Sequence, residues 1–353
     1  MLEFYKNKKV FITGHNGFKG TWLCKMLTMA GAKIYGFSLP EQSDSNFDFF
    51  RLSKISANVN SKYGDIRKFE ALKTAFEEAQ PEIVFHLAAQ PLVIESYKNP
   101  HYTYETNVMG TVNLLECVRH SDCVKSLLNV TTDKVYENKE WCWGYRENEP
   151  LDGYDPYSNS KSCSELVTHS YNKSFFSNNG IAVSTARAGN VIGGGDMAAD
   201  RIIPDCVRAA MQQKEIIVRN PYSIRPYQHV LEPLSAYLII AEKQYNSVSF
   251  ADSYNVGPDN CDCVSTGELV DIFCKKWGNG QNWKNIANDG PHEAKFLKLD
   301  CSKIKTALQW APRWHVEDAV EKTAEWFKCY AANGDVSALM EKQINEFMNT
   351  GAK

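Results

Sequence analysis

The 353-residue sequence lacks the features of a membrane protein, a secreted protein or a nucleic-acid-binding protein. No apolar run approaches the roughly 20 residues that span a bilayer. The N-terminus shows no apolar segment followed by a small-residue cleavage site. The formal net charge is −3 and the basic residues are dispersed, so no nucleic-acid surface is indicated. These absences predict a cytoplasmic protein with neither a membrane nor a nucleic-acid partner.

The eleven cysteines form neither a metal-binding pattern nor a disulfide framework. Their number is odd and no C-x-x-C pair occurs. Cys261 and Cys263 have one residue between them, with no histidine cluster near them in the sequence. We therefore expect free thiols in a reducing compartment and no metal site. Internal repeats, low-complexity tracts and flexible linkers are also absent, so one compact body is expected.

The sequence does contain a regular alternation of short apolar strands and amphipathic helices. Strands are predicted at 8–14, 33–38, 82–88, 126–131 and 181–187, and helices at 17–30, 67–79, 103–119 and 155–177. This α/β pattern predicts a doubly wound parallel sheet of the Rossmann type over 1–188. Glycine and proline then become frequent, and helices are expected near 202–213, 231–244, 265–277 and 315–331. Residues 189–353 are expected to form a smaller mixed α/β lobe, and a return to the main sheet near 252–257 is compatible with the pattern.

A glycine motif connects the first predicted strand to the first predicted helix. Residues 14–20 read GHNGFKG, which places Gly14, Gly17 and Gly20 in G-x-x-G-x-x-G spacing. Glycines permit a tight turn and a close approach of the backbone to a pyrophosphate, and the helix N-terminus offers N–H groups to its charge. A glycine-rich turn without a ligand is the alternative. The strand before the motif and the helix after it favour a dinucleotide site.

The end of the second strand determines which dinucleotide is expected. An acidic residue normally stands there to hold the adenosine ribose, but this position is Ser38, with Glu41 and Asp44 beyond it. No arginine stands at this position to bind the 2′-phosphate of NADP, so NAD is favoured over NADP. Because the ribose carboxylate is missing, and His15 and Asn16 add bulk to the glycine loop, we expect the purified protein to carry less than one NAD per chain.

Tyr157 and Lys161 are candidates for a catalytic pair. Residues four apart share one face of a helix, and a lysine ammonium beside a phenol lowers its pKa by favouring the phenolate. Two solvated helix residues are the alternative, because Y-x-x-x-K is common by chance. Position favours catalysis, because the pair follows the segment 130–136 at the carboxyl end of a predicted strand, where ligands bind in such sheets. Thr132 in that segment would hydrogen-bond a substrate hydroxyl that is being oxidised.

Five stretches make the resemblance to known proteins specific. They are 14–22 (GHNGFKGTW), 86–97 (HLAAQPLVIESY), 132–138 (TDKVYEN), 186–196 (ARAGNVIGGGD) and 225–233 (RPYQHVLEP). On these residues the chain resembles the extended short-chain dehydrogenase/reductase family. Within that family it resembles the NAD-dependent nucleotide-sugar 4,6-dehydratases, and those acting on CDP-glucose most of all. The resemblance extends from the start of the chain to about residue 260.

The resemblance implies a hydro-lyase with a closed redox cycle. C4 of the sugar is oxidised, water is eliminated across C5–C6, and hydride returns to C6, which gives a 4-keto-6-deoxy sugar. Asp133 is implied as the acid of the elimination, and Lys134 stands in the place of the base. The alternative for Lys134 is a surface charge after a strand. The implied setting is deoxysugar synthesis for surface polysaccharides such as O-antigen.

The resemblance also implies the binding residues of an NAD domain at 1–188 and a nucleotide-sugar lobe at 189–353. Cofactor contacts are implied for Gly14, Asn16, Gly17, Phe18, Lys19, Gly20, Ser38, Asp65, Ile66, Leu87, Ala88, Ala89, Tyr157 and Lys161. Substrate contacts are implied for Gln90, Asn190, Arg201, Arg219, Arg225 and His229. Arginine suits such a site because it matches diphosphate oxygens bidentately. Helix capping by Asp65 and surface solvation of the arginines are the alternatives.

Two other functions stay open at this point. An NAD-dependent sugar epimerase would share the glycine loop, Tyr157 and Lys161, but would not need Asp133 and Lys134. A non-catalytic NAD-sensing regulator on the same fold often loses one member of the tyrosine–lysine pair, and this chain keeps both.

The helices over 98–119 and after Tyr157 carry apolar side chains, and the family pairs subunits there. The resemblance therefore implies a homodimer or a homotetramer.

Overall fold

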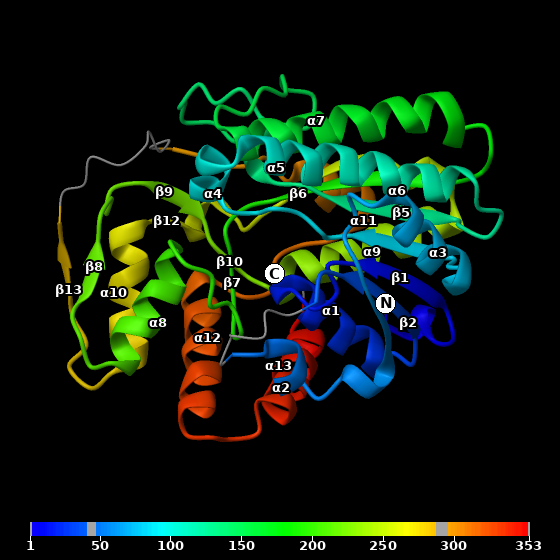
Figure 1. The fold of residues 1–353 in the computed structure, drawn as a ribbon. Coiled ribbons are helices and arrows are strands. Elements are labelled where there is room, and N and C mark those ends of the chain that lie inside the picture. Colours follow the sequence, from blue (N-terminus) through cyan, green and yellow to red (C-terminus); the bar gives the residue numbers. More distant parts are fainter. Residues whose placement is uncertain (1, 41–46, 287–295, 352–353) are drawn as a thin grey trace.

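The computed structural model describes residues 2–40, 47–286 and 296–351, and its centre is a seven-stranded sheet. The strand order is β11-β6-β5-β4-β1-β2-β3, and every neighbouring pair is parallel. The strands are β1 (Lys9–Thr13), β2 (Lys33–Ser38), β3 (Val59–Tyr63), β4 (Ile83–His86), β5 (Ser126–Val130), β6 (Ala182–Ala188) and β11 (Ser253–Val256). The prediction of a Rossmann-type parallel sheet is confirmed (Figure 1).

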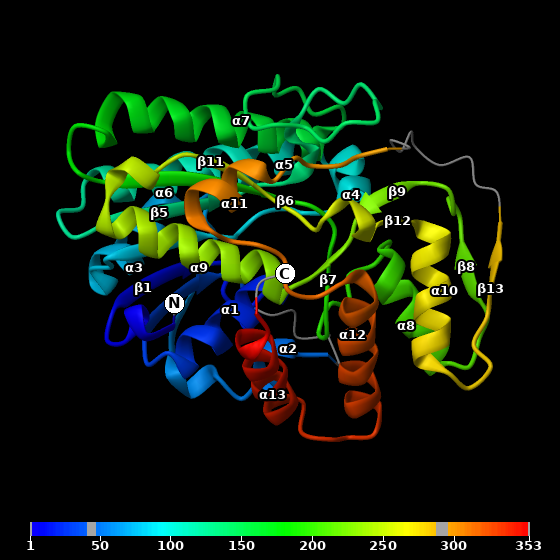
Figure 2. The ribbon, with the colours of Figure 1, turned by 180° about the vertical axis from the view of Figure 1, so that it is seen from behind.

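Helices cover both faces of this sheet. One face carries α3 (Phe69–Ala79), α4 (Val93–Lys98), α5 (Pro100–Tyr104), α6 (Gly110–Arg119) and α7 (Pro156–Tyr171). The opposite face carries α1 (Phe18–Met29), α9 (Leu231–Asn246) and α11 (Ser302–Leu308), which Figure 2 shows from behind. Successive strand residues point to opposite faces. Accordingly, Phe11 belongs to one apolar core, and its neighbours Val10 and Ile12 belong to the other.

The smaller lobe is built from three two-stranded pairs and packed helices. Its strands are β7 (Val191–Ile192) with β10 (Gln228–His229), β8 (Ile216–Val218) with β13 (Trp283–Asn285), and β9 (Ile224–Pro226) with β12 (Cys263–Ser265). Its helices are α8 (Ile202–Met211), α10 (Thr266–Trp277) and α12 (Val316–Ala331). In Figure 1 the lobe lies on the left, beside the carboxyl ends of the central strands. The chain leaves the lobe to add β11 to the main sheet beside β6.

Short elements and the 14-residue helix α13 complete the chain. They are η1 (Leu2–Tyr5), α2 (Phe49–Leu52), η2 (Ser56–Asn58), η3 (Glu105–Met109), η4 (Asp133–Val135), η5 (Asn172–Phe176), η6 (Val248–Phe250), η7 (Asn260–Asp262) and α13 (Val336–Asn349). The elements η3 and η5 are π-helical turns, and the other η elements are 3-10 turns. Among the described helices, none has the length and apolar character that crossing a membrane requires.

The structure departs from several of the expected elements, among them the helix predicted over 155–177, whose last residues form the π turn η5. The helix predicted over 103–119 is interrupted by the π turn η3, in which Asn107 bonds both to Gln90 and to Ser160 of α7. Such tertiary hydrogen bonds leave no trace in hydrophobic spacing. The helix α13 was not predicted, although Val336, Met340 and other buried residues follow helical spacing.

Candidate functional site

The glycine loop has the shape that a dinucleotide pyrophosphate requires. Gly14 has φ +74°, and a Cβ on it would lie 2.8 Å from the Ala88 nitrogen. A Cβ on Gly20 would lie 2.1 Å from the Gly14 carbonyl oxygen. Gly17 is the N-cap of α1 and supplies no capping side chain, so the first N–H groups of the helix have no acceptor within it. The loop residues therefore fit a bound pyrophosphate at this helix N-terminus.

The His15 ring turns inward and away from this cradle. Its Nδ1 hydrogen-bonds with Ser38 Oγ at 2.5 Å and its Nε2 with Ser61 Oγ at 2.9 Å, and the side chain is fully buried. Burial lowers its pKa to about 4. A Cβ on Gly36 would lie 2.3 Å from the ring. The expectation that His15 adds bulk within the phosphate loop is wrong, because the ring fills space beneath β2 and β3 and engages Ser38.

The remaining cofactor candidates lie along the carboxyl ends of β2, β3 and β4. The Asn16 amide donates to the Leu39 carbonyl at 3.0 Å. The Asp65 carboxylate accepts the Arg67 backbone N–H at 2.9 Å and also pairs with the Arg67 guanidinium, while Ile66 is buried against Gly110. Leu87, Ala88 and Ala89 directly follow β4. Glu41 and Asp44 lie outside the described residues.

Tyr157 and Lys161 occupy the first two turns of α7, next to the carboxyl end of β5. Asp155 caps the helix by accepting the Ser158 N–H at 3.0 Å, which aims the first turn at the site. Burial raises the pKa of Tyr157 to about 12, against the opposing effects of a hydrogen bond with Thr132 and the charge of Arg201. Lys161 Nζ donates to the Val130 carbonyl at 3.1 Å. Burial lowers the pKa of Lys161 to about 8, while Glu165 acts in the opposite direction.

Asp133 and Lys134 lie in the 3-10 turn η4 after β5. Thr132 Oγ1 donates to Asp133 Oδ1 at 3.0 Å and accepts the Lys134 N–H at 3.4 Å. The Asp133 side chain is buried, and its Oδ2 has no hydrogen-bond partner within the part of the chain that the structure describes. Burial raises the pKa of this carboxyl, against the charge of Lys134 and the hydrogen bond from Thr132. A buried carboxyl with a raised pKa is suited to donate a proton.

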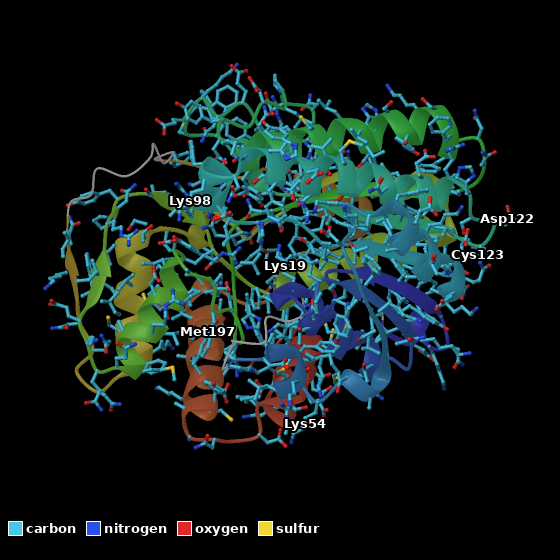
Figure 3. All side chains as sticks on the ribbon, in the orientation of Figure 1. Lys19, Lys54, Lys98, Asp122, Cys123 and Met197 are labelled. Carbon is cyan, nitrogen blue, oxygen red and sulfur yellow. The ribbon has the colours of Figure 1, made fainter. Side chains whose placement is uncertain are left out.

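Lys19 adds a cation near these groups. Figure 3 labels it near the middle of the molecule, where the main sheet meets the smaller lobe. Its Nζ lies 6.0 Å from the centroid of the Tyr237 ring. Burial lowers the pKa of Lys19 to about 8, and the charges of Arg201 and Lys161 act in the same direction. The first turn of α1 thus contributes a charged side chain as well as backbone N–H groups.

The expected substrate residues occupy different surroundings. Arg201 pairs with Asp196 at 3.0 Å, and Arg225 is buried and donates to the Ile224 carbonyl at 2.9 Å. Both are near enough to act on catalytic candidates, Arg201 on Tyr157 and Arg225 on Asp133. Arg219 has a side chain that is 56% exposed. It is paired with Asp200 at 3.7 Å, farther out on the lobe.

Three further substrate candidates are held by the protein itself. The Asn190 carbonyl accepts the Gln228 N–H at 3.0 Å. The Gln90 side-chain amide donates to Thr103 Oγ1 at 2.9 Å. His229 is fully buried, and its ring packs edge-on against Trp22 and Trp314. Its position within the core makes it the least accessible of the expected substrate residues.

The structure brings in residues that sequence reasoning missed. Asn107 accepts the Gln90 N–H at 2.8 Å and donates to Ser160 Oγ at 2.9 Å, so it joins the β4 loop to α7. Glu165 and Arg187 form a buried ion pair at 2.9 Å beneath the site. Glu165 stands four residues after Lys161, and that spacing was an available signal. Local sequence carried no comparable signal for Asn107 or Arg187.

Folding also brings His315 to Cys261 and Asp262. One potential ligand atom from each residue lies within 4.8 Å of the others. The Asp262 carboxylate already accepts the Val316 N–H at 2.8 Å and contacts His315 Nδ1 at 2.9 Å, at the start of α12. Capping of this helix explains the cluster, so no metal function is inferred from it.

The chain is similar to several characterised proteins. A family model described as GDP-mannose 4,6 dehydratase matches residues 11–323. The chain is 46% identical to CDP-glucose 4,6-dehydratase from Salmonella typhimurium (strain LT2), and the alignment covers 98% of each protein. It is 26% identical to UDP-glucuronate 4-epimerase from Thermodesulfobacterium geofontis, over 90% of this chain and 95% of the epimerase.

Solved structures share the fold at lower identity. A dTDP-glucose 4,6-dehydratase from Streptomyces venezuelae with NAD bound gives a TM-score of 0.79 at 22% identity, covering 92% of this chain and 98% of that one. A UDP-glucuronic acid 4-epimerase from Bacillus cereus, in complex with UDP-glucuronic acid and NAD, gives 0.79 at 21% identity, covering 91% and 99%. At these identities the structural likeness establishes the fold.

Proposed function

Because the chain belongs to the GDP-mannose 4,6-dehydratase family, we propose that it is an NAD-dependent nucleotide-sugar 4,6-dehydratase that converts CDP-D-glucose to CDP-4-keto-6-deoxy-D-glucose. The observation that carries the dehydratase assignment is the buried Asp133 carboxyl, whose Oδ2 lacks a partner among the described residues and whose neighbour Thr132 also contacts Tyr157. The choice of CDP-glucose is supported by the 46% identity to the Salmonella enzyme.

The first half of the proposed reaction uses Tyr157, Thr132 and Lys161. NAD, when bound, would accept hydride from C4 of the sugar and return it to C6. Tyr157 would take the proton from the 4-hydroxyl, which Thr132 would orient. A phenolate is needed for this step. Burial raises the pKa of Tyr157, whereas Thr132 and the charge of Arg201 favour the phenolate, and the proposal gives the Lys161 ammonium the same role. Thr132 lies near enough to Tyr157 to lower the pKa of its phenol, which supports their joint role.

The second half of the proposed reaction uses Asp133 and Lys134. A keto group at C4 acidifies the proton on C5, which Lys134 would remove as the base. Asp133 would protonate the departing 6-hydroxyl, and Lys134 would give its proton back to C5 as hydride returns to C6. With the proton that Tyr157 took from the 4-hydroxyl replacing the one lost by Asp133, the net change is loss of one water molecule. The raised pKa of Asp133 suits the acid role. Lys134 is half-buried, and the cations Lys19 and Lys161 lie in the same site.

We assign cofactor binding to the glycine loop and the adjoining strand ends. The N–H groups at the start of α1 would hold the pyrophosphate, and Ser38, Asp65 and Ile66 would border the adenosine. Leu87, Ala88 and Ala89 would border the cofactor along β4. Gly14 supports this assignment, because a Cβ at this position would lie only 2.8 Å from the Ala88 nitrogen, so the loop can pass this close to the end of β4 only without a side chain.

We assign the nucleotide diphosphate to the arginines of the smaller lobe. Arg201 and Arg225 lie nearest to the catalytic candidates and carry the charge that a diphosphate requires. Gln90 and Asn190 would border the sugar, and Arg219 would reach the phosphate from the rim. His229 is fully buried, so it would support these residues from within the core without touching the substrate.

The assembly and setting of the enzyme are further parts of the proposal. Apolar side chains are exposed on the outer helices, with Met109 at 49%, Leu166 at 53% and Phe175 at 41%. A homodimer that packs η3, α6, α7 and η5 against their copies would cover them, and pairing of dimers would give a tetramer. We place the enzyme in the cytoplasm, in deoxysugar synthesis for surface polysaccharides such as O-antigen.

The proposal is tested by incubating the protein and NAD with a panel of CDP-, dTDP-, UDP- and GDP-hexoses. Mass analysis should find a product lighter by one water from CDP-glucose, with the alkali-sensitive absorbance of a 4-keto sugar. An unchanged mass with inversion at C4 would instead identify an epimerase. An inert protein that still binds NAD would support the regulator.

A further inference from the structure

A buried hydrogen-bond network lies directly beneath the proposed catalytic turn. Glu165 of α7 and Arg187 of β6 are its centre, with relative exposures of 2% and 3%. Glu165 Oε1 accepts from Thr131 Oγ1 and, at 3.0 Å, from Arg187 Nε. Glu165 Oε2 accepts from Thr185 Oγ1 at 2.7 Å and from an Arg187 amino group at 2.9 Å. Both carboxylate oxygens are therefore fully engaged by charged or hydroxyl donors.

The network forms hydrogen bonds to residues on both sides of the segment that carries Thr132, Asp133 and Lys134. Thr131, which precedes Thr132, donates to Glu165. Tyr136, which follows the turn η4, accepts from Arg187 at 2.8 Å and donates to Asn255 of β11 at 2.6 Å. The turn η4 therefore has a buried hydrogen bond to the Glu165–Arg187 pair on each side, from Thr131 before it and to Tyr136 after it. A shift of the turn would break at least one of these bonds.

Glu165 also shares a helix face with the proposed catalytic pair. Tyr157, Lys161 and Glu165 follow one another at four-residue intervals on α7. The charged or titratable groups that face Lys161 are Lys19 from α1, His86 from β4 and Glu165 from α7. Burial lowers the pKa of His86 to about 3, so the imidazole is neutral near pH 7. Glu165 is therefore the anion that opposes the loss of the Lys161 proton.

We propose that Glu165 is a positioning residue for C4 oxidation, because its one carboxylate holds the Thr132–Lys134 segment in register with Tyr157 and sustains the ammonium charge of Lys161. The inference rests on the proposed function. Glu165 itself touches neither substrate nor cofactor in this role. It acts by keeping the proton acceptor, the substrate-orienting hydroxyl and the supporting cation in one fixed arrangement.

The test isolates the first half-reaction by using CDP-6-deoxyglucose, which has no 6-hydroxyl to lose. Oxidation at C4 is followed by the absorbance of the reduced nicotinamide, with saturating NAD, from pH 6 to 10. In Glu165→Gln we expect the alkaline limb of the rate profile, set by loss of the Lys161 proton, to move down by about one pH unit. The rate at the optimum should fall about 10-fold or more.

Two matched variants separate charge from shape. Glu165→Asp keeps the charge and shortens the side chain, so its rate should fall while its alkaline limb stays with the wild type. Thr185→Val removes a hydrogen bond to Oε2 of the same carboxylate and keeps the bond from Thr131 to Oε1, so its limb should also stay. Should Glu165→Gln fold poorly because Arg187 loses its partner, Glu165→Gln combined with Arg187→Met removes both buried charges and serves in its place.

The outcomes are distinct. A limb in Glu165→Gln that overlays the wild type, or one that moves equally in Glu165→Asp or Thr185→Val, overturns the positioning role. Wild-type protein that releases no water from CDP-glucose overturns the proposed function instead. A wild type that dehydrates CDP-glucose, together with a limb displaced only in Glu165→Gln, supports both.

Discussion

Asp133 and Lys134 are neighbours in the chain, but the fold gives their side chains different surroundings. The Asp133 carboxyl is 2% exposed, and burial raises its pKa. Lys134 is half-buried at the edge of the same turn. Burial of the Asp133 carboxyl favours its protonated form, whereas the Lys134 side chain is only partly covered. The difference in burial between the two adjacent side chains supports the proposed division of acid and base roles.

Replacement of Lys134 by alanine tests the base of the elimination. Lys134→Ala should bind NAD with unchanged affinity and should lose release of water from CDP-glucose by 10²-fold or more, on the order expected for a missing base. In deuterated water it should also lose exchange of the hydrogen at C5. Full turnover in Lys134→Ala would assign the base elsewhere.

Replacement of Asp133 by asparagine gives the complementary pattern. Asp133→Asn keeps the shape of the side chain but cannot donate a carboxyl proton to the departing hydroxyl. We expect exchange at C5 to persist while water release falls by roughly 10²-fold. Mass spectrometry in deuterated water measures both quantities in one sample. If both the exchange at C5 and the release of water were lost, Asp133 would act before the elimination.

At the scale of elements, β2 is adapted to the ring of His15. The ring lies beneath the strand and hydrogen-bonds with Ser38 at its end and with Ser61 of β3. Gly36 leaves the space, because a Cβ there would lie 2.3 Å from the ring. The strand that would hold the adenosine ribose is thus tied to a side chain of the phosphate loop, and its terminal hydroxyl is already engaged.

The fit between His15 and β2 predicts a stability change. Gly36→Ala should lower the free energy of unfolding by about 1–3 kcal/mol, because the added methyl overpacks a closed interior. Combining Gly36→Ala with His15→Ala should recover part of this loss, which denaturant unfolding of the four proteins in a double-mutant cycle would measure. Additive losses would show that the methyl group meets something other than the ring.

The same element predicts weak retention of the cofactor. Ser38 offers no carboxylate to a ribose, and its hydroxyl is occupied by His15, so the protein should be isolated with less than one NAD per chain. Added NAD should raise dehydratase activity until the site is filled. Release of cofactor from denatured protein, quantified by chromatography, checks the occupancy. One NAD per chain after purification would refute the expectation.

At the scale of the whole molecule, the proposed site lies where the main body and the smaller lobe meet. The main body supplies Tyr157 from α7 and the Thr132 segment after β5, and the smaller lobe supplies Arg201 and Arg225. Both bodies belong to one extended apolar core that joins α1, α9 and α12. Three histidines, His15, His86 and His229, are buried within or beside this core. The stability of the molecule therefore depends on these imidazoles staying neutral.

These histidines predict acid sensitivity. Burial lowers the pKa of His15 to about 4 and those of His86 and His229 to about 3, below the unfolded value of 6.5. The unfolded chain therefore binds more protons below pH 6.5, and stability present above that pH is lost as the pH falls. At pH 5 each histidine should cost about 2 kcal/mol of stability. Urea unfolding at pH 7 and pH 5 measures this loss, and equal midpoints would contradict it.

Particular residues show how far prediction from sequence reached. The strand–helix alternation, the spacing of Gly14, Gly17 and Gly20, and the interval from Tyr157 to Lys161 are local patterns, and they can be recognised in the sequence because each depends on local geometry. The inward orientation of the His15 ring could not be predicted in this way. The cavity that receives its ring is formed by Gly36 and Ser61, which come from two other strands.

The sequence by itself determined the parallel sheet, the dinucleotide loop and the helix that presents Tyr157 and Lys161, because each depends on periodicity or on spacing within one element. Only the tertiary structure decided how Asp133 is buried, where β11 joins the sheet, and which charges surround Lys161. Glu165 and Arg187 are 22 residues apart, yet they meet in one buried pair. Burial and charge pairing arise from packing between distant segments, which no local pattern encodes.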